Sequence, residues 1–192
     1  MFFLGEIEIS ISDNQDALEI DREKLRRTVE YVLGQICGNE SAGGNEPTGN
    51  AGVSPAPYHV NGSAGGNESQ KVSEPAVVSL AIVDDEAISK IKERYFGAAE
   101  VTDVISFDLR DNTKVEQELP DCEIVVNAQC ATREAGRRGV DPQAELNLYV
   151  VHGLLHQLGY DDQTERQSKI MHKKEDQLLE ELGFGTVYEG TG

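Results

Sequence analysis

Two histidines and an aspartate stand at metal-ligand spacing in the segment HGLLHQLGYDD, residues 152–162. His152 and His156 are four residues apart, so on a helix their side chains project from one face, a turn apart. Gly159 allows the chain to reverse after the helix, which lets Asp162 approach from a third direction. Two imidazole nitrogens and a carboxylate oxygen leave the fourth corner of a tetrahedral zinc site for water. The spacing predicts a metal centre made of His152, His156 and Asp162.

Each part of this motif also has an explanation without a metal. A pair of histidines on a buried helix can be satisfied by hydrogen bonds alone. Asp162 stands three residues before Glu165, as in a capping box at the start of a further helix. If Asp162 caps that helix, Asp161 becomes the replacement ligand. The combination of two histidines, a glycine and an acid on an otherwise apolar segment favours the metal, with Asp162 as the third ligand.

The residue after the first histidine bears on the type of chemistry. Zinc peptidases of the H-E-x-x-H type place a glutamate base there. Here the position is occupied by Gly153, which has no side chain to move a proton. A metallopeptidase is therefore disfavoured. Non-haem iron enzymes also use two histidines and a carboxylate, but nothing in this sequence marks a co-substrate site.

The composition is that of a globular protein without a membrane partner. The chain has 192 residues, 38% of them hydrophobic, which suits one domain. No apolar run approaches the roughly 20 residues that span a bilayer, and MFFLGEIEIS does not resemble a signal peptide, so we expect a cytoplasmic location. The net charge of −18 disfavours broad attraction to nucleic-acid backbones or anionic membranes. Three cysteines without C-x-x-C spacing predict neither a disulfide framework nor a thiolate zinc site.

Residues 38–74 differ from the rest of the chain in composition. They hold eight of the 19 glycines and three of the six prolines, and the hexapeptide SAGGNE occurs in them twice. Such a segment has few residues able to fill a core. We expect a single domain over residues 1–192 with a low-complexity, flexible insert at 38–74.

The hydrophobic pattern predicts the elements that must position the metal ligands. Alternating or β-branched apolar runs predict four strands, at residues 5–12, 76–83, 103–107 and 122–126, the second of them central in the sheet. Helical spacing and capping residues predict five helices, which begin at or just after Asp21, Asp84, Asn127, Asp141 and about Gln163.

The apolar positions also predict which helix faces are buried. The second helix is expected to bury Ile88, Ile91 and Tyr95, and the last one to bury Ile170, Leu178, Leu179 and Leu182 before a left-handed cap at Gly183. The helix that carries the histidines has apolar residues on nearly every face and must be central. Strands and helices do not alternate strictly. The predicted class is therefore α+β, a small mixed sheet of about four strands packed against helices, with a zincin-like central helix that bears the metal.

The histidine segment resembles the signature of the YbeY family of bacterial ribosomal-RNA maturation endoribonucleases, H-G-x-L-H-x-x-G-Y-D-H. The matching residues are His152, Gly153, Leu155, His156, Gly159, Tyr160 and Asp161. Upstream, TDVISF at 102–107 is similar to the family's T-D-V-L-S-F, and CEIVV at 122–126 is similar to its G-[DE]-I-V-I strand. The similarity covers roughly residues 76–165, and its motifs occur in the family's order.

The resemblance implies a metal-dependent endoribonuclease that binds one Zn²⁺ ion per chain. It implies action on single-stranded RNA in 16S ribosomal-RNA processing and ribosome quality control. The implied partners are ribosomal RNA, the small ribosomal subunit and ribosome-associated proteins. Thr102, Asp103 and Ser106 of the second motif become candidates for substrate contacts.

Basic residues near the metal helix are the other candidates for RNA contact. Arg133 and Arg137 share one face of the preceding helix, and Lys169, Lys173 and Lys174 form a second cluster. Replacing the first pair should weaken RNA binding and flatten its salt dependence. A solvated helix face is the alternative interpretation of either cluster.

Two residues depart from the family pattern. Asp162 stands where the family has its third histidine ligand, and Phe96 where it has an arginine. A carboxylate preserves ligation but cancels part of the ion's charge, so bound water should be less acidified. Loss of the arginine removes a natural partner for phosphate. These departures leave a second hypothesis open, a non-catalytic, metal-stabilised factor that docks on the ribosome or a partner protein.

Overall fold

The computed structural model describes residues 7–37, 77–110 and 121–187. The strands are β1 (Glu8–Asp13), β2 (Val77–Val83), β3 (Val104–Asp108) and β4 (Cys122–Asn127). The helices are α1 (Arg22–Cys37), α2 (Asp85–Phe96), α3 (Ala128–Arg138), α4 (Pro142–Gln157) and α5 (Glu165–Glu181). All nine predicted elements are present in the predicted order. The whole of the insert predicted at 38–74 lies outside the described residues.

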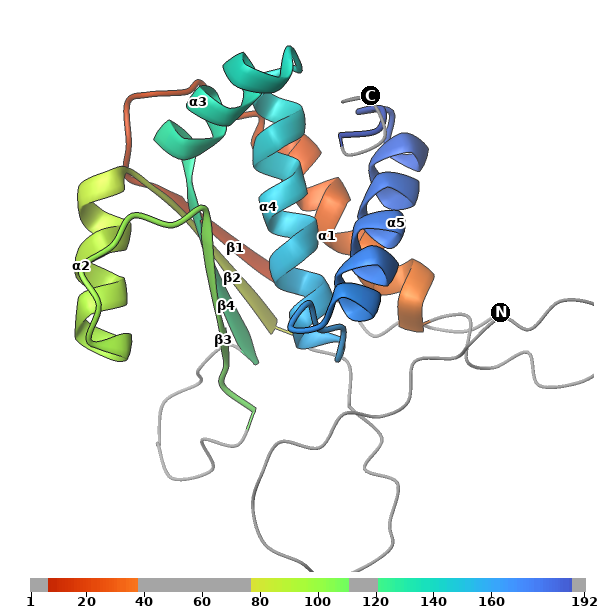
Figure 1. Ribbon diagram of the computed structural model, residues 1–192, viewed down its shortest axis with the longest axis horizontal. Helices are drawn as coiled ribbons and strands as arrows, with labels where there is room; N and C mark the ends of the chain where they lie inside the picture. The colour runs from red at the N-terminus through yellow and green to blue at the C-terminus, as the bar shows by residue number, and fades with distance from the viewer. Residues whose placement is uncertain (1–6, 38–76, 111–120, 188–192) are drawn as a thin grey trace, which may run out of the picture.

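The four strands form one mixed sheet in the order β1-β2-β4-β3. β1, β2 and β4 are parallel, while β3 runs antiparallel to β4 at the edge. Helices α1, α4 and α5 cover one face of the sheet, and α2 covers the other (Figure 1). The predicted α+β class and the interior place of the 76–83 strand are confirmed. No helix among the described residues is long and apolar enough to cross a membrane.

Helix α4 is the central element of the larger core. Twelve of its 16 residues are buried, as predicted from its apolar faces. It packs tightly against the sheet at Gly153, where an added Cβ would lie 2.9 Å from Ile124 Cγ2 and 3.3 Å from Val104 Cγ2. Glycine at this position therefore lets the helix lie against β3 and β4 directly beside His152.

Capping residues fix where the helices begin. The predicted caps Asp84, Asn127 and Asp141 each accept a hydrogen bond from a backbone N–H in the first turn of their helix. Pro142 follows Asp141 as the first residue of α4. These bonds satisfy amides that have no partner within the helix. The start of α4, and with it the register of the two histidines, is thus set locally.

Two predicted core positions are wrong. Tyr95, expected on the buried face of α2, is 60% exposed, because the small core on this side of the sheet fully buries only Ile88 of this helix and partly buries Ile91. The rings of Tyr95 and Phe96 instead pack against Phe107, with centroids 5.0 and 6.1 Å away. Ile170 of α5 is 39% exposed, since that helix buries the next residue, Met171.

Candidate metal centre

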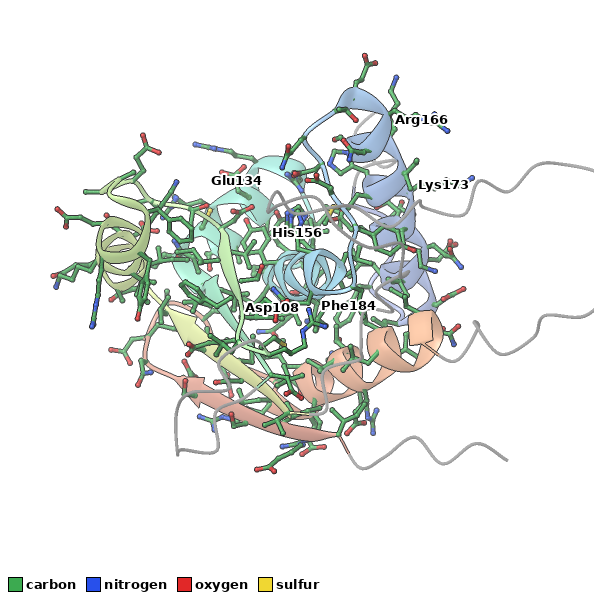
Figure 2. All side chains as sticks on the ribbon, turned by 90° about the horizontal axis from the view of Figure 1, so that it is seen from below. Asp108, Glu134, His156, Arg166, Lys173 and Phe184 are labelled. Carbon is green, nitrogen blue, oxygen red and sulfur yellow. The ribbon has the colours of Figure 1, made fainter. Side chains whose placement is uncertain are left out.

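His152 and His156 meet at the C-terminal end of α4. Their Nε2 atoms are 3.0 Å apart, as expected for residues one helical turn apart whose rings face one another. Figure 2 shows His156 on the side of α4 that lies between α3 and α5. Both rings are partly buried. The predicted pair therefore occurs as a single cluster with two converging nitrogen atoms.

The remaining ring nitrogen of each histidine already has an acceptor. His152 Nδ1 lies 2.7 Å from Oε1 of Glu175 on α5, and His156 Nδ1 lies 3.1 Å from the carbonyl oxygen of Tyr160. An ionised carboxylate and a carbonyl can only accept, so each Nδ1 carries a proton and donates it. In the neutral rings both Nε2 atoms then present lone pairs to each other. Protonation of one ring, or a metal ion between the two nitrogens, removes this repulsion.

The charges around His152 also favour a cation. Burial alone would lower the pKa of His152, but the hydrogen bond and charge of Glu175 outweigh burial and the pKa is raised. The carboxylates of Asp103 and Asp162 act in the same direction. The nitrogen pair therefore lies in a region of negative potential.

Asp162 completes a possible set of three ligands. Its Oδ2 lies 4.0 Å from His152 Nε2, and one ligand atom from each of the three residues lies within 4.8 Å of the others. Zinc bonds of about 2.0–2.2 Å in a tetrahedron place ligand atoms roughly 3.3 Å apart. The two nitrogens are close to this separation and the carboxylate is about 1 Å too far. The Asp162 side chain is 43% exposed in the loop before α5, so it is free to make this approach.

The start of α5 decides between the two interpretations of Asp162. Thr164 is the N-cap, with its hydroxyl accepting from the Gln167 amide and the Gln167 side chain accepting from the Thr164 amide. The alternative of a capping box made by Asp162 and Glu165 is therefore wrong, because the cap lies two residues further on. The Asp161 carboxylate accepts from the backbone N–H of Asp162, 2.8 Å away. Asp162 therefore does not cap α5 and stays the candidate third ligand.

The TDVISF motif lies beside the histidines. Thr102 donates its hydroxyl to the Asp103 carboxylate at 3.0 Å, and both residues are held by Asn127 through their carbonyl oxygens. The charge of Asp103 acts on His152, so this loop is close to the ring. Ser106 shares a strand face with Val104, which contacts α4. Of the three candidate substrate contacts, Asp103 is thus the one with an electrostatic link to the histidines, and Ser106 lies on the sheet face that α4 covers.

The two candidate arginines on α3 are engaged in ion pairs. Arg133 binds both carboxylate oxygens of Asp85, at 2.6 and 3.0 Å, and Arg137 binds Glu134 at 2.6 Å. Among the described contacts, no hydrogen bond or ion pair joins either arginine to the histidines. Of the second basic cluster, Lys173 lies on the outer side of α5, away from His156 (Figure 2).

Two residues at this site were missed by sequence reasoning. Glu175 falls in the apolar stripe of α5 between Met171 and Leu178, and an acid in such a stripe is a signal that could have been used. Arg110 follows β3, and its guanidinium donates to the carbonyl oxygen of Gln157 at 3.2 Å. It thus reaches the end of α4 next to the second histidine, and no sequence pattern indicates this contact.

Comparison with known proteins places the chain in a family. The family model described as Endoribonuclease YbeY matches residues 64–183. A protein from Pelotomaculum thermopropionicum, named endoribonuclease YbeY, is 40% identical over 58% of this chain and 75% of its own length. Proteins of the same name from Caldanaerobacter subterraneus and Desulforamulus reducens are 34% and 38% identical, each over 61% of this chain and 80% and 79% of their own lengths.

A solution structure of a Thermotoga maritima protein aligns with 92% of this chain and 88% of its own, at 21% identity and a TM-score of 0.49. The family model covers more than half of the present sequence. The relatives carry the similarity over about three quarters or more of their lengths. The chain therefore belongs to the YbeY family of endoribonucleases.

Proposed function

We propose that this protein is a metal-dependent endoribonuclease that cleaves single-stranded RNA during processing of 16S ribosomal RNA. Family membership supports cleavage of RNA. The observation that carries the metal dependence is the pair of Nε2 atoms 3.0 Å apart, each on a ring whose Nδ1 is already engaged. The motif resemblance supports the ribosomal substrate, with the small subunit and ribosome-associated proteins as partners.

The ligands of this proposal are His152, His156 and Asp162, with Zn²⁺ as the ion. When bound, the ion supplies a fixed positive charge that stabilises negative charge developing on a phosphodiester oxygen. The protein holds both rings in place through their Nδ1 atoms before substrate arrives. The Asp162 carboxylate lowers the net charge of the centre, which favours binding of the ion but weakens its effect on bound water.

Substrate contacts in this proposal come from two places. Ser106, Thr102 and Asp103 would offer hydroxyl groups to the phosphate and a carboxylate to a ribose hydroxyl of the cleaved nucleotide. Arg133 and Arg137 would bind neighbouring phosphates by exchanging their present carboxylate partners for phosphate oxygens. Because that exchange has a cost, we expect these arginines to add less affinity than unpaired cations would.

A non-catalytic, metal-stabilised ribosome-associated factor is the second candidate. Phe96 favours it, since this side chain stands where the family has an arginine and is 60% exposed. Arg94, two residues earlier, lies 5.5 Å from the centroid of the Tyr95 ring. The net charge of −18 favours it as well, because it opposes RNA binding.

Metal analysis and RNA cleavage together test the proposal. We expect the purified wild-type protein to carry one zinc ion per chain and to cleave a single-stranded 16S fragment, and we expect chelation to stop the cleavage. His156→Ala should lose both properties, while His172→Ala, which changes a histidine on α5 outside the cluster, should keep them. Bound zinc without cleavage that depends on His156 would support the second candidate. A wild-type protein that binds no zinc would refute the metal centre.

A further inference from the structure

We propose that Glu175 is a positioning residue for the metal centre. Its charge holds the His152 ring for metal binding and lowers the stability of the metal-free protein. The inference rests on the proposed metal site. Glu175 is fully buried, and its Oε1 lies 2.7 Å from His152 Nδ1. It belongs to α5, whereas the histidines belong to α4. The carboxylate thus fixes the ring from outside the helix that carries it.

Among the described residues, the His152 ring is the one hydrogen-bond partner of the buried Glu175 carboxylate. Its second oxygen, Oε2, is buried and has no hydrogen-bond partner in the part of the chain that the structure describes. The same stripe of α5 buries Met171 and Leu178, so an apolar side chain would suit this position in a fold selected for stability alone. Burial of an incompletely paired carboxylate is unfavourable. The cost is offset if the positive charge of a bound ion acts on the carboxylate through the imidazole ring.

The neighbouring Asp176 shows what a structural carboxylate looks like on the same helix. It is also buried, 5% exposed, but its Oδ1 accepts from the backbone N–H of Val187 at 2.7 Å and so fastens the segment after α5. One of its oxygens is thus bound by a main-chain amide. Asp176 is therefore a suitable control for Glu175, because the two buried carboxylates are adjacent in sequence but contact different groups.

The two histidine rings also differ in how they are held. His156 donates Nδ1–H to the neutral carbonyl of Tyr160, while His152 donates to an ionised side chain. A carboxylate acceptor makes the imidazole a stronger metal ligand than a carbonyl acceptor does. Glu175 therefore raises the affinity of the site through His152, and replacing it with a neutral acceptor of the same shape removes that effect alone.

Zinc affinity and metal-free stability, measured on the full-length chain, test this assignment. Glu175→Gln keeps an acceptor for Nδ1 but removes the charge. We expect zinc affinity, from competition with a chelator, to fall about 10- to 100-fold. We expect the thermal midpoint of the metal-free protein to stay unchanged or to rise. Asp176→Asn should do the reverse, lowering the midpoint with and without zinc while zinc affinity stays within twofold.

Three outcomes would count against these proposals, and they are distinguishable. Equal zinc affinity of wild type and Glu175→Gln would overturn the assignment, and so would a metal-free midpoint that falls as far as that of Asp176→Asn with no change in affinity. Glu175→Leu serves as a second variant, because it tests the same loss of affinity with a side chain suited to the apolar stripe. Absence of zinc binding by the wild-type protein would overturn the metal site itself. This outcome is detected with the wild-type protein alone.

Discussion

Replacing Gly153 with alanine should destabilise the protein, although alanine is the better helix former. The new Cβ would lie 2.9 Å from Ile124 Cγ2, closer than real Cβ atoms come to other atoms, and 3.3 Å from Val104 Cγ2. Overpacking of a core costs about 1–3 kcal/mol. Alanine returns about 1 kcal/mol of helix propensity. The net loss of about 1 kcal/mol should lower the thermal midpoint by about 2–4 °C for a chain of this size.

Gly136 provides the matched control for this substitution. It also lies within a helix, α3, but an added Cβ there has no neighbour within 4 Å. Gly136→Ala should therefore raise the midpoint by about 2–4 °C, from the same gain of about 1 kcal/mol in propensity. Thermal unfolding followed by circular dichroism compares the two variants directly. If Gly153→Ala is stabilised as much as Gly136→Ala, the close approach of α4 to the sheet is not a real constraint.

Two further predictions concern buried and partly buried polar pairs. The hydrogen bonds of Arg133 lower the pKa of Asp85 in the folded protein. The Asp85 carboxylate therefore stabilises the fold above its unfolded pKa of about 4. This stabilisation is lost as the pH falls through the lower pKa of the folded state. Asp85→Asn should be less stable than wild type at pH 7 in urea unfolding, with a difference that vanishes toward pH 2; a constant difference would contradict the ion pair. Thr28→Val leaves the fully buried Asn147 Oδ1 without the hydroxyl that donates to it at 2.7 Å, and should cost about 1–3 kcal/mol. Thr28→Ser keeps the donor, and equal stability of the two variants would argue against the bond.

The helix starts and the strand order along the chain were predictable because their causes are local. Asp84, Asn127 and Asp141 cap their helices through amides at most three residues away, so the sequence contains the whole interaction. The exposure of Tyr95 was not predictable in this way. Helical periodicity indicates which face of α2 points inward, but not how far the opposing core extends along that face.

The candidate site was predictable to the extent that it lies on one helix. His152 and His156 are neighbours by helical geometry alone. The assignment of Asp162 stayed open because two overlapping segments, Asp162 to Glu165 and Thr164 to Gln167, both fit a capping pattern, and only the structure shows which one is used. The contact of Glu175 with His152 joins two residues that are 23 positions apart and lie on different helices, and no local pattern specifies it.

The three proposed ligands differ greatly in how firmly the protein holds them. The imidazoles belong to the most deeply packed helix, whereas the Asp162 side chain, 43% exposed, extends from a loop. Loops open locally at far lower free energy than core helices. An ion at this centre would therefore exchange through local movement of the Asp162 loop, while helix α4 and the core stay folded. Its residence time would follow the motion of that loop, while its equilibrium affinity would depend on all three ligands and on the groups that hold them.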